Sequence, residues 1–155
     1  MSTETARIRL QVSVLRRMDV LRERLRLAPR TAEHLATGLH GEREALFHLR
    51  AQGYTIVARR WRTAKLRGDV DLIGWDGEWL CFIEVKTRRT RDPLAPAESA
   101  VDADKQEMLR RMAGAYLRAF PEKRRREIPV RFDIVSVYLQ QTGVECDVYR
   151  GAFGR

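Results

Sequence analysis

The sequence predicts an α/β fold in which helices flank a central sheet, and the order of three kinds of pattern supports this class. Apolar residues recur at helical spacing over 38–52 and again over 102–120, where Asp102 or Asp104 can cap the helix. Runs with strand-like composition cover 54–62, 69–75, 78–86, 130–139 and 144–149. The chain therefore reads as a helix, a three-strand meander, a second helix and a final strand pair.

Length and composition predict one domain. A chain of 155 residues that is 44% hydrophobic can bury one ordinary core. We assign residues 31–155 to that domain and residues 1–30 to an N-terminal extension. The extension carries apolar residues at helical spacing among arginines, which leaves three alternatives: a docking or dimerisation helix, a weakly ordered tail, or a start site upstream of the true initiator Met18.

The most informative segment is a predicted hairpin over 69–86. Asp76-Gly77 favours a two-residue turn, which would place Asp69 opposite Glu84 and Asp71 opposite Phe82. Because side chains alternate across a strand, Asp69 and Asp71 would share one face with Glu84 and Lys86, beside the apolar residues Ile73, Trp75, Leu80 and Phe82. Facing carboxylates repel each other, so this face predicts a compensating cation.

The chemistry that these residue types suit is phosphodiester hydrolysis. Mg²⁺ prefers oxygen ligands and is commonly held by one or two carboxylates plus phosphate oxygens, which Asp71 and Glu84 could provide. Mn²⁺ is the alternative ion. Lys86 could steady the attacking hydroxide or the developing charge. The alternative interpretation is a solvated charged face, which is the usual environment of such residues.

A family resemblance rests on these residues. Asp71 followed by Glu84-Val85-Lys86 resembles the PD-(D/E)xK nuclease signature. A longer set of blocks resembles the YraN-like bacterial family, namely Gly41-Glu42, Gly53-Tyr54, Trp61-Arg62, 68–73 and 84–88. This resemblance implies a restriction endonuclease-like core, similar to Holliday-junction resolvases, with a mixed sheet after the first helix. It also implies a metal held by Asp71, Glu84, the Val85 backbone carbonyl and Glu42.

Glu42 has an independent argument. It falls on the stripe of Leu39, Ala45, Leu46 and Leu49, which predicts a carboxylate on the core-facing side of the first helix. Burying an unpaired carboxylate is costly, so a cation or a donor is expected beside it. The alternative is that Glu42 lies near the helix start and complements the helix dipole.

Net charge indicates a polyanionic partner. The formal charge is +9, with 30 Lys plus Arg and a pI of about 10.3. Candidate phosphate contacts are Arg60, Arg62, Arg88, Arg89, Arg91 and Lys105. Trp61 is expected to pack rather than to stack on a base, and 123–126 is expected to be a solvated linker.

Several function classes are not favoured. No signal peptide or membrane span is expected, and Cys81 and Cys146 are predicted to be reduced thiols in strands, which together predict a cytoplasmic protein. The sequence therefore predicts a Mg²⁺-dependent nuclease acting on DNA, with branched or damaged DNA as the candidate substrate. The alternative is a non-catalytic nucleic-acid-binding or scaffold module, and a homodimer stays open.

Overall fold

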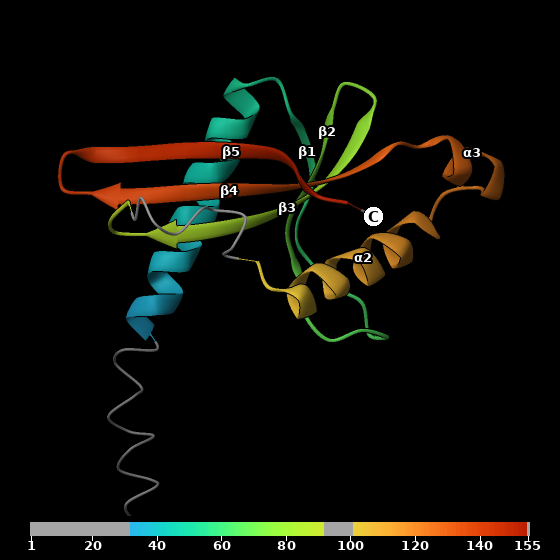
Figure 1. The fold of residues 1–155 in the computed structure, drawn as a ribbon, viewed down its shortest axis with the longest axis horizontal. Helices are drawn as coiled ribbons and strands as arrows, with labels where there is room; N and C mark the ends of the chain where they lie inside the picture. The colour runs from blue at the N-terminus through green and yellow to red at the C-terminus, as the bar shows by residue number, and fades with distance from the viewer. Residues whose placement is uncertain (1–31, 92–100, 155) are drawn as a thin grey trace, which may run out of the picture. The chain divides into compact units, whose positions relative to one another are not determined.

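The computed structural model describes residues 32–91 and 101–154. The elements in chain order are a first helix over 32–51, β1 (Thr55–Trp61), β2 (Val70–Asp76), β3 (Trp79–Arg88), α2 (Ala103–Leu117), α3 (Glu122–Glu127), β4 (Val130–Gln140) and β5 (Gly143–Phe153) (Figure 1). This order confirms the predicted α/β class. The expected N-terminal extension lies outside the described residues, as do residues 92–100.

The sheet is five-stranded and mixed. Its strand order is β1-β2-β3-β4-β5, with a parallel pairing between β3 and β4 and antiparallel pairings elsewhere. Parallel neighbours require a long crossover connection, and α2 and α3 lie in the connection from β3 to β4. The helical pattern over 102–120 thus marks a crossover helix.

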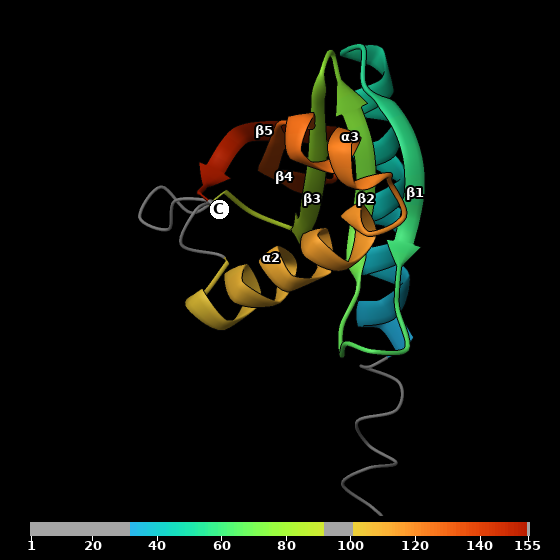
Figure 2. The ribbon, with the colours of Figure 1, turned by 90° about the vertical axis from the view of Figure 1, so that its right-hand side faces the viewer.

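A hydrophobic core lies on each face of the sheet. One core contains Ile73, Leu80 and Phe82 with residues of α2, and Figure 2 shows α2 on that side of the strands. The other contains Leu72 and Ile83 with Ala45, Leu46 and Leu49 of the first helix. Leu80–Glu84 of β3 are all buried, so β3 is the central strand of both cores. The alternation predicted for the hairpin is confirmed.

The predicted hairpin register is wrong by two residues. Asp76 pairs with Trp79 and Ile73 with Phe82, so the turn is centred on Gly77 and Glu78. Gly77 has φ 59°, and a glycine with positive φ at the first central position fits a type II′ turn. Continuing this register places Asp71 opposite Glu84. A shift of two preserves the faces, because side chains alternate with period two.

Three other expectations about helices need correction. The first helix begins at or before residue 32, so Glu42 lies in its middle and the helix-dipole interpretation does not apply. Leu39 is 46% exposed, although the stripe predicted it to be buried. The basic run expected to be a linker forms most of α3, where Arg126 pairs with Glu122 at 2.6 Å one turn away.

The N-terminus of α2 is capped by a side chain. Asp102 accepts a hydrogen bond from the Lys105 N–H at 2.8 Å, as the first of the two predicted caps would.

Cys81 and Cys146 are free thiols in β3 and β5, as predicted. Across 32–91 and 101–154, the helices are all too short or too polar to span a bilayer.

Candidate functional site

Asp71 and Glu84 lie at adjacent positions of β2 and β3, beyond the apolar residues that α2 covers. Asp71 Oδ2 accepts a hydrogen bond from the Val85 N–H at 2.8 Å. Burial and the nearby charge of Glu84 together raise the pKa of Asp71 to about 7, against the effect of that hydrogen bond. The half-buried Asp71 carboxylate is therefore a charge with incomplete compensation.

Glu84 is held between two lysines. Lys86 Nζ lies 3.0 Å from Oε1 and Lys105 Nζ lies 3.0 Å from Oε2, while Glu84 itself is only 4% exposed. The Lys105 contact is an ion pair without hydrogen-bond geometry, since Oε2 has no hydrogen-bond partner. The structure thus brings Lys105 to the site from α2 and places positive charge around both oxygens.

Glu42 reaches the same region from the first helix. Burial raises its pKa, Arg60 opposes this effect, and the charges of Asp69 and Glu84 add to the rise. Its Oε2 is buried without a hydrogen-bond partner, and Arg60 Nε lies 3.8 Å away. A glycine permits this approach, because a Cβ on buried Gly41 would overlap Thr87 Oγ1 of β3.

The residues present fit a divalent cation with few protein ligands. Among the described residues, no three Asp, Glu, His or Cys side chains lie close enough together to form a complete protein cage. Mg²⁺ does not require one, since it usually keeps several waters and takes substrate phosphates as further ligands. Asp71 and Glu84 would hold such an ion, and the orphaned Glu42 Oε2 could bind one of its waters.

The predicted phosphate contacts have different surroundings. Arg62 pairs with Asp69 at 3.0 Å, and Arg60 faces Glu42 with a left-handed backbone at φ 46°. Arg88 is half-buried at the end of β3 and Arg89 is exposed. Lys105 lies at the site, where it contacts Glu84.

Arg91 contacts two carboxylates and an aromatic ring. It contacts Asp147 at 2.6 Å and Glu145 at 3.0 Å, and its guanidinium lies 4.4 Å from the centre of the Tyr138 ring. A phosphate would have to compete with these carboxylates. Trp61 packs edge-on against Tyr116, as expected for a core residue.

Ser136 is a site residue that the sequence did not reveal. It is fully buried in β4, it is the register partner of Lys86, and its hydroxyl has no hydrogen-bond partner. A serine in an apolar strand gives no functional signal by itself. Only the parallel pairing of β3 with β4 places its hydroxyl beside the candidate catalytic lysine.

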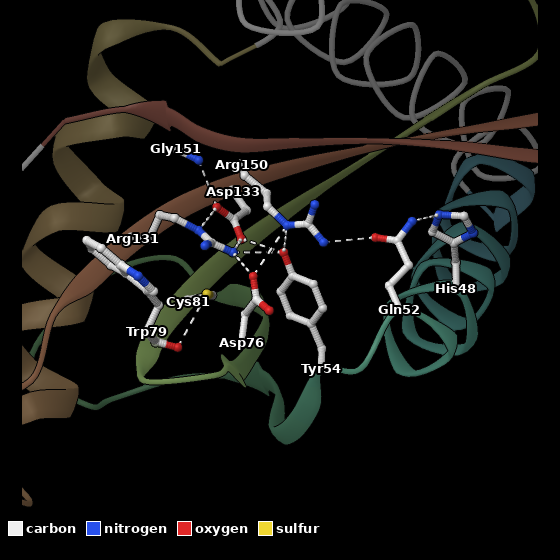
Figure 3. A network of polar contacts seen from close by, with 10 residues as sticks. All are labelled: His48, Gln52, Tyr54, Asp76, Trp79, Cys81, Arg131, Asp133, Arg150 and Gly151. Atoms are coloured by element: carbon white, nitrogen blue, oxygen red, sulfur yellow. Dashed lines mark hydrogen bonds and ion pairs between the residues drawn. The ribbon is translucent and has the colours of Figure 1, made fainter.

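A second polar network, also unforeseen, lies on the other face of the sheet near the start of β3. Asp133 is fully buried and accepts hydrogen bonds from Arg131, the Tyr54 hydroxyl and the Gly151 N–H (Figure 3). Arg131 also contacts Asp76 at 2.6 Å. The network joins the hairpin turn to β4 and β5, which gives it a structural role.

The chain matches known proteins over most of this framework. The family model described as "Uncharacterised protein family UPF0102" matches residues 41–137. The chain belongs to the UPF0102 family. The matched range includes Glu42, Asp71, Glu84, Lys86 and Lys105, and it confirms the YraN-like part of the predicted resemblance.

Similar UPF0102 proteins occur in distant bacteria. The chain is 52% identical to one from Koribacter versatilis over 125 residues, 81% of this chain and 84% of that protein. It is 47% identical to one from Solibacter usitatus over 119 residues, 75% of this chain and 84% of that protein. A third, from Rhodococcus opacus, is 44% identical over 108 residues, 70% of this chain and 86% of that protein.

Proposed function

We propose that this protein is a Mg²⁺- or Mn²⁺-dependent nuclease that hydrolyses phosphodiester bonds in DNA, with branched or damaged DNA as its substrate. The observation that carries the proposal is the pair of carboxylates on adjacent strands, half-buried Asp71 and buried Glu84, with lysines beside Glu84. The resemblance of Asp71 and Glu84-Val85-Lys86 to the PD-(D/E)xK signature points to the same chemistry.

Each residue has a role that follows from its position. Asp71 and Glu84 would hold the ion, which when bound would polarise the scissile phosphate and lower the pKa of a bound water. The ammonium group of Lys86 lies next to Glu84 and would stabilise the attacking oxygen or the negative charge of the pentacoordinate transition state. Lys105, which lies at the other oxygen of Glu84, would contact a phosphate oxygen.

Glu42 and the net charge complete the proposal. The unpartnered Glu42 Oε2 could accept a hydrogen bond from a metal-bound water and orient it. A formal charge of +9 favours association with a polyanion, and it keeps the substrate near an acidic site that would otherwise repel phosphate. A binding or scaffold module without cleavage activity is the alternative, since a fold does not establish a function.

A cleavage assay separates the two functions. Purified protein is incubated with linear, flap and four-way DNA in Mg²⁺, in Mn²⁺ and in EDTA, beside Asp71→Asn and Glu84→Gln. The exposed turn residue Glu78 supplies a matched control, Glu78→Gln. The nuclease proposal expects metal-dependent cleavage that both site variants lose and the control keeps. Equal cleavage by all four proteins, or none on any substrate, would reject it.

A further inference from the structure

A basic cavity lies between the β1–β2 loop and α2, away from the carboxylates. It has a volume of about 370 Å³ and is lined by Lys65, Leu66, Arg67, Met108 and Arg111. None of these lining residues is acidic, and the three cations are exposed at its rim. Its volume falls within the range of about 300–1,000 Å³ typical of small-ligand sites. Three cations around an apolar floor match a phosphate that carries a sugar or a base.

The wall of this cavity is fixed by close packing. Gly68 has φ 102°, and a Cβ there would lie 2.9 Å from Met108 Sδ. The loop therefore needs glycine at this position both for its backbone and for its contact with α2. Leu66 also packs against the core beneath α2. Lys65 and Arg67 lie on this packed loop and Arg111 lies on α2, an arrangement that reduces the entropy lost on binding a ligand.

A further cavity adjoins the first one. A second cavity of about 340 Å³ shares Leu66 and is lined by Arg62, Thr63, Gly68 and Asp69. On α2, Met108 follows Lys105 by three residues and Arg111 follows Met108 by three, so the three lie near one another along the helix surface. Lys105 contacts Glu84 and Arg111 lines the cavity, so α2 carries a cation at each of the two sites.

We infer that Lys65, Arg67 and Arg111 bind a backbone phosphate of a DNA strand, with its sugar or base against Leu66 and Met108. Six residues of helix from Lys105 to Arg111 span about 9 Å, so the bound phosphate would lie within a few nucleotides of the one held at Lys105. This inference rests on the proposed function only in taking nucleic acid as the ligand.

The test measures binding in EDTA, so that it does not depend on cleavage. Fluorescence anisotropy of a labelled DNA duplex is recorded against salt for the wild type and for Lys65→Ala/Arg67→Ala/Arg111→Ala. We expect affinity at low salt to fall by about tenfold or more and the log–log salt slope to become shallower by about 0.9 per lost contact. The control removes equal charge from exposed cations outside both cavities, Arg50→Ala/Arg118→Ala/Lys123→Ala.

The outcomes are separable. Equal losses in both triple variants, or none in the cavity variant, would overturn the inference, and Asp71→Asn would still report on cleavage. A cavity-specific loss in a protein that never cleaves would support the inference while removing the nuclease proposal. Thermal unfolding of each variant checks that it is folded, and the single variant Arg111→Gln gives a milder second test. The inference would also be overturned if adenosine monophosphate bound the wild type and not the cavity variant while both proteins had the same affinity for DNA.

Discussion

Lys105 Nζ lies 3.0 Å from Glu84 Oε2, so the first turn of α2 places a positive charge beside a carboxylate in the middle of the central strand. Lys86 Nζ lies 3.0 Å from the other oxygen of this carboxylate, Oε1. A divalent ion that uses Glu84 must therefore displace an ammonium group. The lysines compensate for the carboxylates when no metal is bound, and they compete with metal binding.

Removal of Lys105 should accordingly strengthen metal binding. Two unit charges about 4 Å apart interact by about 1 kcal/mol even in water, and the repulsion from a dication is about twice that, so Lys105→Met should raise Mn²⁺ affinity by about tenfold or more. Isothermal titration calorimetry without DNA measures this change. Unchanged or weaker affinity would show that Lys105 and the ion do not share Glu84.

Asp71→Asn should stabilise the protein when metal is absent. Asparagine can still accept the Val85 N–H bond at 2.8 Å, but it removes a half-buried charge whose pKa is raised by burial and by Glu84. A gain of about 1 kcal/mol corresponds to about 2–4 °C in melting temperature for a chain of this size. Thermal unfolding in EDTA gives the comparison, with Glu78→Gln as control. A lower melting temperature would mean that the carboxylate contributes to stability.

The network around Asp133 should be critical for stability and not for metal binding. Arg131→Met would leave the fully buried Asp133 without its guanidinium partner, which typically costs about 3–5 kcal/mol. Urea unfolding measures the loss, and calorimetry on the folded fraction should give wild-type metal affinity. A loss below about 1 kcal/mol would be inconsistent with the contacts in Figure 3.

Asp76 should contribute to stability in a pH-dependent way. The hydrogen bond from Arg131 holds the pKa of Asp76 below its usual value, so the folded carboxylate binds protons more weakly than the unfolded one. This stabilisation is present above the unfolded pKa of 3.8 and is lost as pH falls toward the lowered folded pKa. Asp76→Asn should therefore flatten the decline in unfolding free energy from about pH 5 down to the lowered folded pKa. A decline as steep as in the wild type would refute this linkage.

Local sequence patterns predicted the parts of the fold that depend on one or two neighbouring elements. Period-two alternation placed Asp71 and Glu84 on one face, and helical spacing placed Ala45, Leu46 and Leu49 in a core. The register was missed because the pattern Asp-Gly-Glu allows two turn positions that differ by one residue, and the sequence alone does not decide between them.

Features built from distant segments were not predictable in the same way. Ser136 lies beside Lys86 only because β3 and β4 pair in parallel, and Arg91 meets Asp147 only through β4 and β5. The cavity at Lys65 and Arg111 likewise requires the β1–β2 loop to pack on α2. No local periodicity encodes these contacts, since they depend on strand order and on crossover geometry.

The most direct test of the central claim is the single-turnover cleavage rate of Lys86 variants on the best substrate, in parallel with DNA affinity in Ca²⁺. If Lys86 acts on the reacting oxygen, Lys86→Ala should lower the rate by about 10²-fold or more. Lys86→Arg should also be impaired, because a delocalised guanidinium does not replace a compact ammonium. Affinity should stay nearly constant. Cleavage by both variants at the wild-type rate would contradict the assignment of Glu84 and Lys86 as the catalytic centre.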